Sequence, residues 1–265
     1  MKRPRGGAGR PAHGLVAPAQ RPYAGGMVSY RVRSPFRKPC IARVLLLIPA
    51  LCLPLPAAAV DDSSAAWLGV NRSGNFKGED WSSWLYMAQT EYRRFDALEG
   101  TRLAMVRGGL GYRFDRNWRA FVQADYRYTY TPERGTFREK RLREMLQWAG
   151  PGWGATTLRL RFLLEQRWID ERSGTGWRFR PRLRVDFPIQ GRPGVNGIVF
   201  VETLHDLRTT DWVNSGWNEK RLFLGARLPL RSGLDVETGY LAQWIDPFGS
   251  GDRLSHTLTA MFRFH

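Results

Sequence analysis

The sequence predicts an all-β protein: a transmembrane, antiparallel up-and-down β-barrel of about ten strands that follows a cleaved signal peptide. Two observations favour this fold class. Apolar and polar residues alternate with a period of two in successive segments, which is typical of strands with one apolar and one polar face. These segments reach the ~9–11 residues that a tilted strand needs to cross a bilayer, whereas strands of soluble sandwiches commonly have ~5–6.

Residues 1–59 are predicted to be a basic leader that ends in the signal peptide, and residues 60–265 are predicted to form the barrel. The leader contains ten Lys or Arg and no acidic residue. Its apolar run, Val44–Leu55, has 12 residues, which is too short for a membrane-spanning helix and suits a signal-peptide core. The small residues 57–59 then provide a cleavage pattern, which places the mature start near Val60.

The leader also accounts for most of the net positive charge and for both cysteines. The formal net charge is +17, but residues 60–265 hold 31 basic and 24 acidic residues, a net charge of +7. No nucleic-acid partner is expected, because no zinc-finger spacing or basic helix follows the leader. Cys40 and Cys52 lie in the leader, so the mature chain has no disulfide or thiolate metal site. The stretch before Met27 is rich in Pro, Gly and Arg, which makes Met27 an alternative start.

Ten segments from Trp84 onward are predicted to be strands, and an eleventh candidate surrounds Trp67. Single-chain bacterial barrels have an even number of strands. We therefore expect Trp67 to lie in a periplasmic segment, or in an extra hairpin of a twelve-strand barrel. The ten strands are expected near residues 84–93, 104–113, 118–128, 140–148, 158–168, 177–187, 197–205, 221–228, 234–244 and 254–264.

The connections between these strands predict the orientation of the barrel. Short turns at Asp115–Asn117, Gly150–Gly154 and Pro229–Gly233 are expected on the periplasmic side, and the loops Asp206–Gly216 and Asp246–Asp252 outside. The alternative is a soluble β-sandwich or lipocalin-like barrel, in which the apolar faces would form the core.

The alternation also assigns the two faces of the barrel wall. Leu224, Leu228, Val236 and Tyr240 are expected to contact lipid. The opposite face is rich in charge, and it is interpreted either as an anion-attracting pore or as an ion-paired plug that fills a narrow lumen. The expected lumen network consists of Arg159, Arg161, Glu165, Arg167, Arg178, Arg180, Arg182, Arg184, Asp186, Arg221 and Glu237.

The pairing inside this network depends on the hairpin after Ile169. A turn centred near Arg172–Ser173 would place Glu165 opposite Arg180, and Arg159 opposite Asp186. Other arginines would then oppose each other directly, which is unfavourable in a sheet. They need acidic partners from across the barrel, and the candidates are Glu91, Asp125, Glu202 and Glu237.

Several runs resemble the domain-of-unknown-function family numbered 2490. These runs are RLRFLLEQRW, SGWNEKR and RLFLGARLPLRSGLDVETGYLAQW, followed by His256. The matching positions are Glu165-Gln166-Arg167, Glu219, Arg221, Gly225 and Gly239-Tyr240, whereas Lys220 departs from the family pattern. The resemblance implies a bacterial outer-membrane barrel and no assigned reaction. The last strand also resembles the signal read by the barrel-assembly machinery, with Phe264 followed by His265.

No catalytic or metal site is expected. Ser255 and His256 are adjacent and therefore point to opposite faces, and the same holds for His205 and Asp206. The three histidines after the leader lack metal-ligand spacing, and no cofactor is expected.

The expected function is that of a small, non-enzymatic barrel in the outer membrane of a Gram-negative bacterium, with a structural or minor small-solute channel role. Its expected partners are outer-membrane lipid, lipopolysaccharide and the barrel-assembly machinery. One alternative is a barrel enzyme that acts on lipid or peptide at the extracellular rim. Another is adhesion or assembly through the outer loop 206–218, where Asp211, Trp212 and Trp217 are expected to be exposed.

Overall fold

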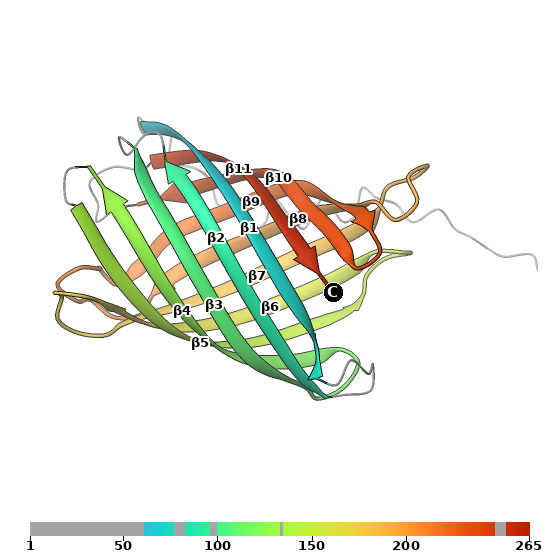
Figure 1. Ribbon diagram of the computed structural model, residues 1–265, viewed down its shortest axis with the longest axis horizontal. Helices are drawn as coiled ribbons and strands as arrows, with labels where there is room; N and C mark the ends of the chain where they lie inside the picture. The colour runs from blue at the N-terminus through green and yellow to red at the C-terminus, as the bar shows by residue number, and fades with distance from the viewer. Residues whose placement is uncertain (1–60, 77–82, 96–99, 133–134, 247–252) are drawn as a thin grey trace, which may run out of the picture. The chain divides into compact units, whose positions relative to one another are not determined.

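The computed structural model describes residues 61–76, 83–95, 100–132, 135–246 and 253–265. The predicted leader and cleavage site lie outside these residues. Among the described residues, no helix has the length and apolar character needed to cross a membrane. The described chain forms eleven strands (Figure 1), which are β1 (Asp61–Asn75), β2 (Trp84–Phe95), β3 (Thr101–Arg113), β4 (Trp118–Thr131), β5 (Gly135–Pro151), β6 (Thr157–Ile169), β7 (Gly176–Pro188), β8 (Asn196–Asp206), β9 (Gly216–Arg231), β10 (Leu234–Ile245) and β11 (Arg253–Phe264).

The strands close into one barrel in chain order, so the prediction of an up-and-down β-barrel is confirmed. All neighbours are antiparallel except β1 and β11, which pair in parallel with Trp67 opposite Thr259. The closure leaves no sheet edge unpaired. The expected counts of ten and twelve strands were both wrong, because the Trp67 segment is a full strand of the ring. With an odd number of strands, the first and last run in the same direction and can close the barrel only in parallel.

The two faces of the wall differ sharply in chemistry. On β4, the inward residues Phe121, Gln123 and Asp125 are buried, whereas the outward Val122 is 55% exposed and Tyr126 39%. Among the described residues, twenty polar or charged residues are buried against twelve hydrophobic ones. The apolar faces therefore do not form the core, as they would in the soluble alternative.

The connections between strands lie alternately at the two ends, or rims, of the barrel. The connections 114–117, 152–156, 189–195 and 232–233 share one rim, called the turn rim, while 170–175 and 207–215 share the other, the loop rim. At the turn rim, the Asp115 carboxylate accepts the backbone N–H groups of Asn117 (2.6 Å) and Trp118 (2.8 Å). These hydrogen bonds lower the pKa of the exposed Asp115.

The inner wall also contains a small apolar cluster of Ile198, Phe223 and Leu241. Gly225 and Gly239 lie directly opposite each other on β9 and β10. A Cβ atom added to Gly225 would lie 2.5 Å from Cζ of Phe223, and one added to Gly239 would lie 2.8 Å from the same atom. The Phe223 ring therefore covers both glycines, an arrangement known from aromatic rescue of strand glycines.

Candidate functional site

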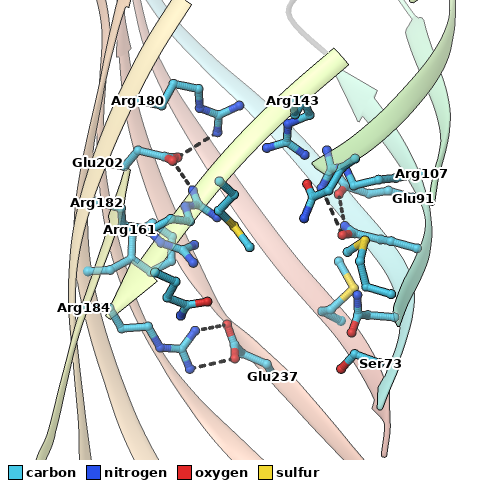
Figure 2. A pocket seen from close by; sticks show the side chains of 18 of the residues that line it. Ser73, Glu91, Arg107, Arg143, Arg161, Arg180, Arg182, Arg184, Glu202 and Glu237 are labelled. Carbon is cyan, nitrogen blue, oxygen red and sulfur yellow. Dashed lines mark hydrogen bonds and ion pairs between the residues drawn. The ribbon is translucent and has the colours of Figure 1, made fainter. Parts of the chain in front are cut away.

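The candidate site is the interior of the barrel, where a cavity of about 300 Å³ remains between charged side chains (Figure 2). Thirteen arginines and three glutamates contribute to its lining. Their side chains enter from opposite walls, with Arg161 and Arg182 on one side and Arg107 and Glu91 on the other (Figure 2). Both described lysines, Lys140 and Lys220, are exposed on the outer face. Arginine suits the interior because its planar fork can bond two carboxylate oxygens at once.

Glu165 on β6 is the most enclosed member of the network. It is fully buried, and its Oε1 atom lies 2.8 Å from Nη1 of Arg180 and 3.0 Å from Nε of Arg143. Its Oε2 atom lies 3.3 Å from Nη1 of Arg141. Three strands, β5, β6 and β7, therefore converge on one carboxylate.

Two further glutamates link strands that are not direct neighbours in the ring. Glu202 on β8 pairs with Arg161, and its Oε2 lies 3.0 Å from Nη2 of Arg180 and 3.3 Å from Nη1 of Arg221. Glu237 on β10 accepts two hydrogen bonds of 2.9 Å from Arg184 on β7, which crosses the lumen to reach it (Figure 2). Arg227 and Arg263 approach Glu237 to 3.8 Å and 2.7 Å. These contacts fix the width of the lumen as well as neutralising charge.

The expected register of the β6–β7 hairpin is wrong by two residues. Glu165 lies opposite Arg178, and Arg159 lies opposite Arg184. The ion pairs still form along the diagonals, because Arg180 reaches Glu165 and Nε of Arg159 lies 2.7 Å from Oδ2 of Asp186. A shift of two keeps every side chain on its face, and diagonal neighbours remain within reach of long side chains.

A second group of ion pairs lies toward the loop rim. Asp206 is fully buried and accepts two hydrogen bonds from Arg178, at 2.8 Å and 2.7 Å. Arg167 contributes a longer contact of 3.4 Å to Asp206, and its Nε lies 2.7 Å from Oε1 of Glu139. Glu139 also pairs with Arg141 at 2.7 Å.

The contribution of β5 to the lumen was not predicted. Its inward residues include Glu139, Arg141 and Arg143. The signal was present as charges at every second position. It was hidden because Arg138, Lys140 and Glu144 place charges on the outer face of the same strand, which weakens the apolar alternation. The structure also brings Arg107 and Asp125 together across β3 and β4.

The network as a whole contains more arginines than carboxylates. Among the described residues, nine interior carboxylates are ion-paired, and fourteen arginines share them. The carboxylates belong to Glu91, Asp125, Glu139, Glu165, Asp186, Glu202, Asp206, Glu219 and Glu237. The arginines are Arg93, Arg107, Arg127, Arg141, Arg143, Arg159, Arg161, Arg167, Arg178, Arg180, Arg184, Arg221, Arg227 and Arg263.

Two other arginines of the cavity wall form no ion pair with any described carboxylate. Arg182, one of the expected network residues, instead lies over the ring of Phe200, with Cζ 4.9 Å from the ring centroid. Arg119 donates its Nε hydrogen to Oε1 of Gln147 at 3.1 Å.

The three loop residues Asp211, Trp212 and Trp217 differ in exposure. Trp217 is 54% exposed and stacks on His205 with centroids 4.5 Å apart, and Asp211 is also exposed. Trp212, expected to be exposed, is half-buried: Cζ of Arg167 lies 4.9 Å from its ring centroid. The Asp211 carboxylate accepts the backbone N–H of Ser173 at 3.2 Å, which ties this loop to the β6–β7 turn.

The serine and histidine candidates separate as the alternation requires. Ser255 is buried inside, while Nδ1 of His256 contacts the Tyr240 hydroxyl on the outer face. His205 contacts Trp217, whereas its neighbour Asp206 turns inward to Arg178. No group of three His, Cys, Asp or Glu residues within the described ranges has a metal-binding arrangement.

A known family model matches most of the chain. The family model described as "Protein of unknown function (DUF2490)" matches residues 64–254. The chain belongs to this family. The resembling positions now have physical roles in the barrel, since Glu165, Glu219 and Arg221 are ion-paired and Gly225 and Gly239 lie under Phe223.

Individual relatives add little to this assignment. An uncharacterized protein of Methylorubrum extorquens is 29% identical over 138 residues, which cover 50% of this chain and 60% of that protein. The siderophore receptor PirA from Pseudomonas aeruginosa is 16% identical with a TM-score of 0.29, covering 69% of this chain and 35% of the receptor. Similarity at that level does not transfer a function.

Proposed function

We propose that this chain is an outer-membrane β-barrel of a Gram-negative bacterium whose lumen is filled by an ion-paired plug. Its role is then structural, or that of a minor channel for small solutes. The observation that carries the proposal is the inverted distribution of side chains. Leu224 (48%) and Leu258 (68%) are exposed outside while Glu165 and Asp206 are fully buried inside. Such a surface is stable in lipid, where a closed barrel satisfies every backbone group and apolar side chains need no water.

The number of strands supports a filled lumen. A barrel of ~8 strands is just wide enough for side chains to fill its interior, and an aqueous channel needs ~16. With eleven strands and long arginines entering from several walls, little free bore remains beyond the cavity. At the loop rim, Trp212 lies over Arg167 and narrows the mouth further.

The partners of this proposal follow from its location. Outer-membrane lipid and lipopolysaccharide would contact the apolar outer face. The barrel-assembly machinery would read the last strand, which ends in Phe264 and His265.

Two measurements test the proposal. The mature protein is expected to fractionate with outer membranes and to migrate differently on gels before and after heating, because closed barrels resist detergent. A periplasmic protein without a heat shift would refute the membrane barrel. In planar bilayers the purified barrel should show little or no conductance, whereas large, steady, anion-selective currents would overturn the plug and support an open channel.

A further inference from the structure

The surplus of arginine in the lumen is concentrated on one cross-strand row. Gln147 lies opposite Arg119 on one side and Arg161 on the other, and Arg161 lies opposite Arg182. The row thus runs across β4, β5, β6 and β7, and it continues on β8 with Glu202, which lies opposite Arg182. All five side chains line the cavity. Like charges directly opposed in a sheet are unfavourable, yet Arg161 and Arg182 face each other. The one carboxylate of the row, Glu202, is shared by Arg161, Arg180 and Arg221. This row needs additional negative charge.

The unsatisfied hydrogen-bonding groups have the same character. Every buried side-chain atom without a hydrogen-bond partner among the described residues is a nitrogen donor, and none is an oxygen. Four of these donors are Nε atoms of the cavity-lining Arg127, Arg161, Arg180 and Arg227. Nε of Arg143 also lacks a hydrogen bond, but it lies 3.0 Å from Oε1 of Glu165. A buried cationic donor without a partner is costly. The cavity therefore has more donors and positive charge than acceptors, although Glu91, Glu202 and Glu237 contribute to its lining.

The shape of the donors indicates the class of ligand. A guanidinium presents a planar fork that matches two oxygens of a phosphate or carboxylate. Directly opposed residues on neighbouring strands have Cβ atoms ~5 Å apart, so the Arg161 and Arg182 forks can approach one small anion from two directions. A tetrahedral oxyanion has enough oxygens for both forks, and a cavity of about 300 Å³ can hold it.

We propose that the lumen contains a binding site for a small tetrahedral oxyanion, such as inorganic phosphate, formed by Arg161 and Arg182 with Gln147 and Arg119 beside them. The anion completes the charge balance of the row and accepts hydrogen bonds from donors that lack protein partners. It occupies the cavity of Figure 2, between the Arg161–Arg182 wall and the wall that carries Glu91 and Arg107.

The test uses the purified full barrel in detergent. Its thermal unfolding and its heat of binding are measured while inorganic phosphate replaces chloride at constant ionic strength. Saturable binding with a rise in the unfolding temperature is expected for phosphate and not for chloride. In R182Q the affinity should fall about tenfold or more, as expected when one charge-assisted contact is lost. The matched control R138Q removes an exposed arginine from the outer face of β5 and should bind like the unmodified protein.

R182Q is also expected to fold, because Arg182 forms no ion pair with a described carboxylate. Without phosphate, R182Q should unfold at the same or a higher temperature than the unmodified barrel, since one of two opposed like charges is gone. If its heat shift on gels is lost, R119Q provides the same test at the other end of the row. A response that is equal for chloride, or that neither variant weakens, overturns the site.

The source of the oxyanion can be separated in the same assay. If lipid A, which carries phosphate groups, displaces inorganic phosphate when added to the micelles, the site takes the phosphate of a lipid headgroup. If lipid A has no effect, the site takes the free ion. Both outcomes require the site itself. They are independent of membrane location, which the fractionation and heat-shift experiments test separately.

Discussion

Two parts of the barrel's inner surface differ in the side chains that fill the narrow lumen. The inward positions of β5, β6 and β7, here called the charged wall, carry long arginines around buried carboxylates such as Glu165. The inward positions of β10, β11 and β1, here called the small-residue wall, include Gly239, Ser255, Thr257 and Gly69 between longer residues such as Trp67 and Glu237.

The difference shows how long and short side chains are distributed between the two walls of the lumen. Arg184 of the charged wall reaches Glu237 on β10, where the next inward position is Gly239. Long side chains on both walls would collide, and short ones on both would leave an open bore. The two walls are therefore complementary, and they should respond very differently to the loss of one polar group.

The largest effect is expected from Glu165→Ala on the charged wall. The substitution leaves Arg141, Arg143 and Arg180 without their shared carboxylate in a desolvated interior. Breaking a buried ion pair by removing one partner costs about 3–5 kcal/mol, so the free energy of unfolding in detergent or lipid should fall by about that amount. The matched control is Glu144→Ala on the outer face of the neighbouring strand, where no lumen arginine loses a partner. Equal effects from the two substitutions would contradict the central role of Glu165.

A second prediction concerns the outer face that both walls share. Leu224 is expected to contact lipid together with Leu228, Val236 and Tyr240. Arginine at position 224 should cost about 2–4 kcal/mol if the residue lies near the midplane of the bilayer, as measured by unfolding from lipid vesicles. A spin label at 224 should be reached by a lipid-soluble quencher. Access only to a water-soluble quencher would reverse the assignment of the faces.

The strands and their faces could be predicted because apolar outward residues alternate with polar inward residues along each strand. The number of strands could not, because alternation says nothing about whether the first and last strands close in parallel. The even-number rule left Trp67 either in a periplasmic segment or in an extra hairpin, whereas β1 is a single strand that pairs with β2 and β11 along its length.

Register was predictable only to within two residues. The β6–β7 turn contains Glu171 with φ 66°, and the N–H of Arg172 donates to the carbonyl of Ile169 at 3.2 Å. A non-glycine residue with positive φ is uncommon, and nothing in the local sequence placed it there. The expected ion pairs Glu165–Arg180 and Arg159–Asp186 form in spite of the different register, because arginine reaches its diagonal neighbours. The contribution of β5 was missed because that strand is charged on both faces.

A smaller effect is expected from Gly225→Ala, where the small-residue wall meets β9. A Cβ atom at this position would overlap the carbonyl oxygen of Thr238 as well as the ring of Phe223, so a flexible side chain alone cannot relieve the clash. Overpacking of this kind costs about 1–3 kcal/mol, measured as a loss of unfolding free energy. Gly108→Ala is the control, because an added Cβ there meets nothing within 4 Å. If both substitutions are neutral, the close approach at Gly225 is relieved by backbone movement.

The smallest effect is expected from Thr257→Val on β11, and it gives the sharpest contrast with Glu165→Ala. Both residues are fully buried and inward-facing, so they differ in chemistry rather than in exposure. Thr257 accepts a hydrogen bond of 2.8 Å from the Gln243 side chain and makes a longer one of 3.5 Å with the Ser255 hydroxyl. Valine preserves the shape while removing both. A neutral hydrogen bond contributes about 0.5–1.5 kcal/mol, so the unfolding free energy should fall by roughly 1 kcal/mol. The Gln243 amide can then turn to Ser255, which lies opposite it on β11. If Thr257→Val were as damaging as Glu165→Ala, burial alone would set the cost, and the distinction between a charged and a small-residue wall would fail.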